Sequence, residues 1–202
     1  QKIEVWDYED LKEMCNMDAV KAFRDHALNP EKPAMRGSHE NGDIFFQHRE
    51  ACNRVYDNLP AVVEKYMAMV NKKLGTNYDL FNYYGAPDAD RVIVAMGSVC
   101  DTIEEVVDYL NARGEKVGLI KVHLYRPFSE KYFFDVLPKT VKRIAVLDRT
   151  KEPGALGEPL YQDVRTLFYN KENAPLIVGG RYGLGSKDTT PAQIIAVYDN
   201  LK

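Results

Sequence analysis

Cysteine is scarce in this sequence, and the few cysteines are far apart. The 202 residues include three of them, Cys15, Cys52 and Cys100. An odd and widely spaced set supplies neither a disulfide framework nor the closely spaced cysteines that hold an iron–sulfur cluster. We therefore expect no disulfide scaffold, no cysteine-ligated cluster and a reducing, cytoplasmic location.

An excess of basic residues and long apolar runs are also missing. Lys and Arg number 27 against 30 Asp and Glu, which gives a formal net charge of −3. Domains that bind nucleic acid usually carry a basic excess, so this balance argues against such a partner. No apolar run approaches the roughly 20 residues that span a membrane, and no signal-peptide pattern is evident. We expect a soluble protein that has neither nucleic acid nor a membrane as its partner.

The pattern that is present is typical of an α/β protein. Residues 92–96 form a continuous apolar run, as in a strand covered on both faces, and Gly97 turns the chain into an amphipathic helix. Asp101 and Glu104 predict a capping box at the start of that helix, and Gly114 predicts a left-handed residue just beyond its end. The apolar face of the helix consists of Ile103, Val106, Val107 and Leu110. This strand–turn–helix is the first unit of a predicted parallel sheet.

The same unit recurs along the rest of the chain. Further strands, each followed by a helical pattern, are predicted at residues 117–122, 144–147 and 176–178. Alternating strands and helices predict an α/β fold with a doubly wound, mostly parallel sheet and right-handed crossovers. Turn residues at 83–90 mark the best boundary, so we expect a sheet domain at 86–202 and an extended N-terminal helical arm at 1–85.

The arm carries local helix signals. Asp7 and Asp18 are placed to cap two short helices. Pro60 suits the first position of a longer helix, and Gly75 suits its end.

The beginning of the chain suggests a piece of a longer polypeptide. It opens with Gln1 and not with Met, and residues 2–6 already alternate like a strand. The stretch 33–47 has no sustained period, which is typical of a segment that wraps another part of a protein. Arg36 and Arg49 flank this region, where surface ion pairing is favoured over anion binding. We expect the arm to dock on protein outside this chain.

Two loops at the carboxyl ends of predicted strands are candidate ligand sites, because ligands of doubly wound sheets bind at this edge. Loops 123–128 and 148–157 belong to the same edge. The backbone at 97–100 and 179–187 could contact an anion, and the candidate residues are Gly97, Ser98, Gly183, Gly185 and Lys187. The second loop lacks the glycine spacing of dinucleotide-binding and P-loop motifs, so a structural turn is favoured.

No set of side chains is spaced for catalysis or metal binding. Cys100 precedes a helix start, where a thiolate is stabilised, but a small buried apolar role is favoured. His123 follows a strand with no nucleophile or carboxylate placed beside it by spacing. His39 and His48 do not match a metal-ligand spacing. We predict no catalytic residue and no metal ligand in this chain.

Five segments between residues 27 and 191 together closely resemble one enzyme family. They read ALNPEKPAMRGSHENGDIFFQHREACN, YYGAPDADRVIVAMGSVCDTIEEV, HLYRPFSEKYFFDVLP, LDRTKEPGALGEPLYQDV and GGRYGLGSKDTTP. The family they resemble is pyruvate:ferredoxin (flavodoxin) oxidoreductase. Its members decarboxylate pyruvate on thiamine diphosphate, pass electrons through iron–sulfur clusters to ferredoxin or flavodoxin, and release acetyl-CoA.

The resemblance implies that residues 1–84 end the first domain of such an enzyme and that residues 88–202 form its second domain. The second domain is similar to the C-terminal domain of transketolases, which carries neither thiamine diphosphate nor clusters. Thiamine diphosphate, Mg²⁺, the [4Fe-4S] clusters and the substrate CoA would then belong to the parent enzyme. The implied partners are its remaining domains, a second copy of the parent, and ferredoxin or flavodoxin.

Two functions remain open at this point. The preferred one is a non-catalytic assembly and scaffold domain of that oxidoreductase, inactive by itself, whose parent converts pyruvate and CoA to acetyl-CoA and CO2. The alternative is a module that binds the phosphate of CoA or of a nucleotide through loops 97–100 and 179–187.

Overall fold

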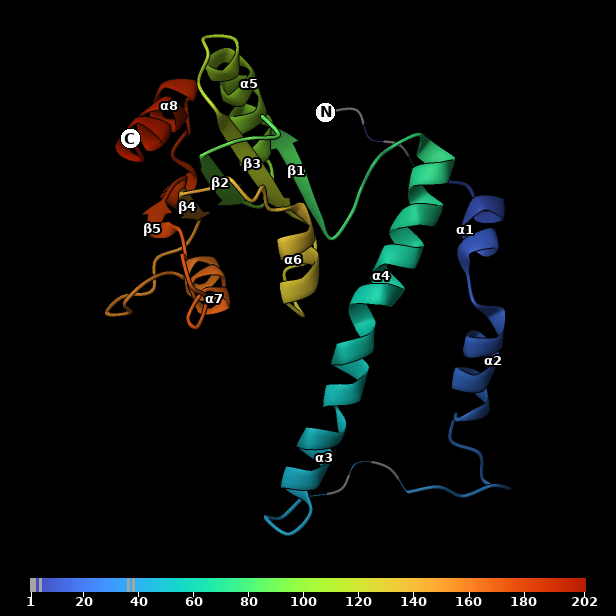
Figure 1. The fold of residues 1–202 in the computed structure, drawn as a ribbon. Coiled ribbons are helices and arrows are strands. Elements are labelled where there is room, and N and C mark those ends of the chain that lie inside the picture. The colour runs from blue at the N-terminus through green and yellow to red at the C-terminus, as the bar shows by residue number, and fades with distance from the viewer. Residues whose placement is uncertain (1–2, 4, 36, 38) are drawn as a thin grey trace. The chain divides into compact units, whose positions relative to one another are not determined.

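The chain consists of two compact units (Figure 1). The structure, a computed structural model, describes residues 3, 5–35, 37 and 39–202. Contacts between residues divide the chain into Gln1–Gly75 and Thr76–Lys202. The first unit is helical and the second contains the sheet, so each is described by itself.

The described residues of the first unit form four helices. They are α1 Tyr8–Met14, α2 Met17–Asp25, α3 Phe45–Ala51 and α4 Asn53–Leu74. Asp7 caps α1 as expected, since its carboxylate accepts a hydrogen bond from the Asp10 N–H at 3.0 Å. The second predicted helix is present as α2, but its predicted cap, Asp18, was wrong. Its cap is Asn16, whose side-chain oxygen accepts the Ala19 N–H at 3.0 Å, and Asp18 lies in the first turn.

Helix α4 is longer than the sequence predicts. Pro60 lies inside it and not at its start, because the helix begins at Asn53 and the chain tolerates the one lost backbone hydrogen bond. Gly75 ends the helix in the left-handed conformation, with φ 69°, as expected. The expected strand at 2–6 is absent from its described residues 3, 5 and 6. Lys2 and Glu4 of that strand, like Arg36, lie outside the described residues.

The second unit is built on one five-stranded sheet. Its strands are β1 Phe81–Gly85, β2 Arg91–Ala95, β3 Val117–Val122, β4 Arg143–Asp148 and β5 Leu176–Arg181. Their order is β1-β3-β2-β4-β5, and only β1 runs antiparallel to its neighbour. The predicted α/β class and the mostly parallel sheet are confirmed, and the four strands expected from the sequence lie where the apolar runs placed them.

Helices cover both faces of the sheet, so the fold is doubly wound (Figure 1). Helices α5 Val99–Asn111 and α8 Pro191–Asn200 share one face, and α6 Glu130–Val136 and α7 Pro159–Leu167 lie on the other. A buried core joins β2 to the first pair through Ile93, Ile103 and Tyr198. Alternate residues of the parallel strands enter opposite layers, which is why their sequences read as unbroken apolar runs.

Strand β1 was not predicted. Its five residues pair with β3 from Phe81 opposite Val122 to Gly85 opposite Gly118. The sequence FNYYG lacks a clear period, so its strand conformation is decided by the partner strand. The contacts consequently divide the chain at Gly75, before β1, and not at the expected boundary after residue 85.

The start of α5 also differs from the expectation. Ser98 occupies the N-cap, and Asp101 lies within the helix, so Asp101 and Glu104 do not form a capping box. The chain reverses at Gly97, where φ is 82°, and the helix begins at once. Glu104 instead pairs with the Lys121 ammonium on β3, at 2.6 Å. Gly114 does adopt the predicted left-handed conformation, with φ 86°.

Gly85 and Gly97 both have positive φ, but only Gly85 is crowded by neighbouring atoms. Substituting each glycine therefore distinguishes the free-energy cost of the backbone conformation from that of a steric collision. A Cβ at Gly85 would lie 2.5 Å from the Val117 carbonyl oxygen, at φ 132°, whereas a Cβ at Gly97 would meet nothing within 4 Å in the described structure. We expect Gly85→Ala to lower the free energy of unfolding by roughly 2–5 kcal/mol, from strain and collision together. Gly97→Ala should cost only about 1–2 kcal/mol, from the left-handed backbone. Urea midpoints measure both, and equal losses would show that the β1–β3 contact is not tight.

Candidate functional site

The carboxyl ends of β2 and β4 form the topological switch point of the sheet. The chain leaves β2 through α5 toward β3 on one side, and later returns through α6 to β4 on the other side. Loops diverge at such a point and leave a crevice, which is where ligands of doubly wound sheets bind. A cavity of about 380 Å³ lies there, which we call the switch-point cavity. It is lined by Met96, Gly97, Ser98, Tyr125, Leu147, Asp148, Arg149, Thr150, Pro159 and Tyr182.

Two contacts hold the walls of the switch-point cavity together. The Nε of Arg149 donates a hydrogen bond to the Gly183 carbonyl at 3.2 Å, so the end of β4 is tied to the loop after β5. The Tyr182 hydroxyl donates to the Met96 carbonyl at 3.3 Å, which ties the same loop to the end of β2. Burial raises the pKa of Tyr182, so its hydroxyl stays protonated as this donor at neutral pH.

Asp148 is the buried acid of this site, and its role is structural. It is 6% exposed, and its two carboxylate oxygens accept hydrogen bonds from the Leu160 and Tyr161 N–H groups, at 3.0 and 3.1 Å. These donors belong to the first turn of α7, where a negative charge is stabilised by the helix dipole. Burial raises the pKa of Asp148, while the two backbone hydrogen bonds act in the opposite direction. The carboxylate therefore anchors α7 on the sheet.

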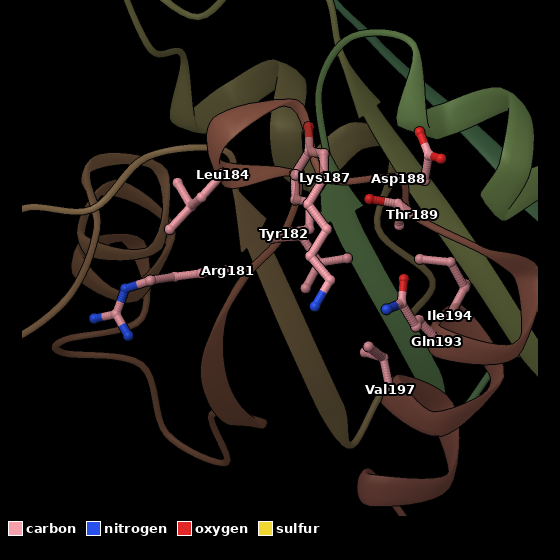
Figure 2. A pocket seen from close by; sticks show the side chains of 11 residues that line it. Arg181, Tyr182, Leu184, Lys187, Asp188, Thr189, Gln193, Ile194 and Val197 are labelled. Atoms are coloured by element: carbon pink, nitrogen blue, oxygen red, sulfur yellow. The ribbon is translucent and has the colours of Figure 1, made fainter.

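A second cavity, of about 350 Å³, lies between the end of β5 and α8 (Figure 2). We call it the α8 cavity. It is lined by Leu147, Arg181, Tyr182, Gly183, Leu184, Lys187, Asp188, Thr189, Gln193, Ile194 and Val197. Apolar side chains from α8 and β4 meet basic and polar ones from the loop after β5. Leu147 and Tyr182 line both cavities, so the two hollows are neighbours.

The five candidate anion contacts do not converge on one cavity. Gly97 and Ser98 line the switch-point cavity, and Gly183 and Lys187 line the α8 cavity. Gly185 lines neither, and a Cβ there would meet nothing within 4 Å among the described residues. Anion binding by these residues stays a prediction.

The cysteine and histidines that were considered for catalysis or metal binding, and for which no such role was predicted, have separate surroundings. Cys100 is 5% exposed under the β2–α5 turn, and burial raises its pKa from near 9 to about 11, so the small apolar role is the one observed. The His123 ring packs edge-on against Tyr78, with ring centroids 5.5 Å apart. The His48 Nδ1 pairs with Glu40 at 2.6 Å. Among the described residues, no group of three or more His, Cys, Asp or Glu side chains is placed to hold a metal ion.

Sequence reasoning missed Arg149, Thr150, Tyr125 and Tyr182 as cavity residues. All four lie in loops that the sequence assigned to the ligand edge of the sheet, so their position was predicted but their role was not. The contact of Tyr182 with Met96 could not be predicted from local sequence, because it joins residues 86 positions apart. Only the strand order brings them together.

The fold and these cavities define an α/β domain whose ligand edge has no assembled catalytic set in the described structure. Residues 89–194 match the family described as "Pyruvate:ferredoxin oxidoreductase core domain II". Residues 1–68 match a second family, described as "Pyruvate flavodoxin/ferredoxin oxidoreductase, thiamine diP-bdg". The chain therefore belongs to the pyruvate:ferredoxin oxidoreductase family, and the resemblance read from the sequence is confirmed.

Individual relatives agree with this assignment. The chain is 62% identical over 201 residues to a pyruvate-flavodoxin oxidoreductase of Enterobacter agglomerans and 58% identical to a pyruvate:ferredoxin oxidoreductase of Moorella thermoacetica. Each alignment covers 100% of this chain and 17% of the relative, so the chain spans about one sixth of the length of these proteins.

A solved structure titled "Split gene transketolase, inactive beta4 tetramer" is similar at a TM-score of 0.42 and 15% identity. The matched region covers 61% of this chain and 39% of the chain in that structure. Similarity at this level identifies neither a ligand nor a reaction. Within the part of the chain that the structure describes, none of the helices combines the length and apolar character needed to cross a membrane.

The pKa of Cys100 gives a test of its burial. The thiolate is the reactive form, and a pKa of about 11 in place of 9 leaves about 100-fold less thiolate near pH 8. We expect Cys100 to be alkylated at least about 100-fold more slowly than exposed Cys15 in the folded chain, with the difference lost in urea. Mass spectrometry of the labelled peptides measures both rates. Equal rates in the folded chain would mean that the β2–α5 turn opens readily.

Proposed function

We propose that this chain is a non-catalytic assembly domain of a pyruvate:ferredoxin (flavodoxin) oxidoreductase. The parent enzyme converts pyruvate and CoA to acetyl-CoA and CO2 and passes the electrons to ferredoxin or flavodoxin. Thiamine diphosphate, Mg²⁺ and the [4Fe-4S] clusters act in other parts of that enzyme, so this chain by itself has no activity. Its own task is to hold neighbouring domains, and a second copy of the parent, in place.

One observation carries the proposal: the described residues of the first unit form almost no apolar core. None of the described residues of α1, α2 or α3 is buried, and in α4 only Pro60 is buried. Large apolar side chains are exposed instead, including Phe23 at 81% and Met35 at 94%. Exposed apolar surface of this extent is typical of a segment that docks on other protein.

The comparisons support this view of the first unit. Residues 1–68 match the thiamine-diphosphate-binding family, and the whole chain covers 17% of its relatives. On this proposal, the helices of the first unit are covered in the parent enzyme by protein that lies outside the 202 residues. The second unit, in contrast, buries a complete core between its sheet and helices.

The proposal predicts different protease sensitivity for the two units. In the isolated chain, cleavage should start within residues 1–75 and leave a folded core of 76–202, because a unit without a core opens at low cost. In the full-length polypeptide, the same sites should be protected. Mass spectrometry of the fragments identifies the cut sites. If the isolated chain resists protease throughout as a dilute monomer, the first unit needs no partner and the proposal is wrong.

A pair of variants in α2 sharpens this test. Phe23→Ser removes an exposed apolar side chain and should restore cleavage of the arm in the full-length polypeptide, while the isolated chain behaves as before. Lys21→Ser is the control, since Lys21 is exposed and pairs only locally, with Asp25 at 2.5 Å. Cleavage that Phe23→Ser leaves unchanged would exclude α2 from the docked surface.

A second function is favoured by the switch-point cavity. Gly97 and Ser98 lie in one cavity with Arg149 and Thr150, so a backbone turn, a hydroxyl pair and a guanidinium face the same space. This is chemistry suited to a phosphate group. On this view the chain is a module that holds a phosphate of CoA or of a nucleotide.

Calorimetric titration of CoA into the isolated chain separates the two functions. The assembly role predicts no saturable heat. The ligand-binding role predicts saturable heat that Arg149→Ala weakens by about tenfold to 100-fold, since a charged hydrogen bond contributes about 1.5–3 kcal/mol. Lys187→Ala would have the larger effect if the α8 cavity were the site. Arg113→Ala is the control, because Arg113 stacks on Tyr109 at 3.4 Å and lines neither cavity.

A further inference from the structure

Strand β5 is an edge of the sheet, and half of its backbone groups face away from it. It pairs with β4 on one side only. The Leu176 N–H donates to the Lys142 carbonyl at 2.9 Å, and the Tyr182 N–H donates to the Asp148 carbonyl at 3.2 Å. Backbone groups alternate in direction along a strand, so the even-numbered residues face β4. The N–H and C=O groups of residues 177, 179 and 181 therefore point outward.

This edge lacks the features that usually prevent pairing with another strand. Such edges are commonly protected by lysine, by proline or by a bulge. The sequence LIVGGR contains neither lysine nor proline, and its only charge, Arg181, is bound by Glu158. The side chains of Leu176 and Val178 are 59% and 39% exposed. The edge is thus apolar, unprotected and open along its length.

Two hollows lie along β5 on its α7 face, one on each side of the Tyr161 ring. The first, the Ile177 hollow, has a volume of about 400 Å³ and is lined by Tyr161, Arg165, Phe168, Tyr169, Ala174, Pro175, Leu176 and Ile177. The second, the Arg181 hollow, has a volume of about 230 Å³ and is lined by Leu156, Gly157, Glu158, Tyr161, Gly179, Gly180 and Arg181. Ile177 and Arg181 face the same side of the strand. An added strand would therefore direct alternate side chains toward these hollows.

Two glycines allow the Tyr161 ring to separate the hollows. A Cβ at Gly179 would lie 3.0 Å from the Tyr161 Cγ, and a Cβ at Gly157 would lie 2.2 Å from its Cδ1. The ring can therefore lie directly on the backbone of β5 and of the loop before α7. The division into two hollows is a packed feature of this surface and depends on residues at three places in the sequence.

We propose that the β5 edge and its two hollows bind an extended apolar segment of the longer polypeptide, which adds a strand to the sheet. This inference rests on the proposed function, because that segment lies outside the 202 residues. The backbone of the segment would pair with residues 177, 179 and 181, and its alternate side chains would fill the hollows.

The structure favours such a segment over the β5 strand of a second copy. In a continuous sheet made by two copies, the α7 face of the partner strand would present Ile177, Gly179 and Arg181 again. Glycine has no side chain to fill a hollow, and arginine would bring a second positive charge to Arg165 or Arg181. A segment with larger apolar side chains at alternate positions fits both hollows.

Hydrogen exchange of the peptide that spans β5 tests the proposal. In the isolated chain, the amides of residues 177, 179 and 181 should exchange fast, and those of 178 and 180 slowly. In the full-length polypeptide, the three fast amides should slow by about tenfold or more, because each gains a hydrogen bond. A peptide from α5, buried in both samples, is the internal control.

Each outcome decides the question. If the three amides exchange equally fast in both samples, no strand is added and the proposal is overturned. If they slow in the isolated chain as its concentration rises, the occupant is a second copy and the proposal is overturned. The assembly role is read separately, from the peptides of α1 to α4, so either idea can fail while the other stands.

A substitution at Ile177 gives an independent readout. Ile177→Pro removes one outward N–H without removing a hydrogen bond to β4, and Ile177→Val keeps it. In the full-length polypeptide, the proline variant should lose the protection of residues 179 and 181, while the valine variant should keep it. The β4 peptide, slow in both variants, shows that the sheet is folded. Protection that survives the proline would contradict strand addition.

Discussion

The complete burial of β2 is the constraint on which the sheet unit depends. All five residues of this strand are buried, including Arg91, and they lie between β3 and β4 and between two layers of helices. A charge can remain there because the Arg91 guanidinium bonds to Asp90, Glu115 and the Tyr198 carbonyl. Strand β2 is central in the sheet. The switch point lies beside it because the chain adds β3 and β1 on one side of β2 and β4 and β5 on the other.

Burial of β2 also decides where this unit can meet other molecules. The two layers of helices close both faces near the middle of the sheet, while the outer strand β5 and parts of the loops at the carboxyl ends stay exposed. Two cavities lie among those loops, and two hollows lie beside β5. Ligand contact and protein contact would thus use different parts of the same sheet.

The two units differ in how much apolar surface they bury for themselves. The sheet unit encloses side chains such as Ile103 and Tyr198 completely. The helical unit leaves Phe23 and Met35 exposed, although its helices α1 and α2 begin at side-chain caps. A helix of this kind keeps its shape through local hydrogen bonds but gains most of its stability from packing. The sheet unit therefore supplies its own core, whereas the described residues of the helical unit leave most of their apolar surface exposed.

The sequence by itself determined the features that arise from local patterns. Apolar runs located β2, β3, β4 and β5, and a helical pattern after each of these strands predicted the helices between and after them. Its segments also identified the family. Tertiary structure decided the rest: β1 became a strand only because β3 offers its edge, and the N-cap of α5 is Ser98 and not Asp101 because Gly97 reverses the chain. The cavities required strand order as well, since Tyr182 reaches Met96 only across the assembled sheet, and no local pattern encodes which strands become neighbours.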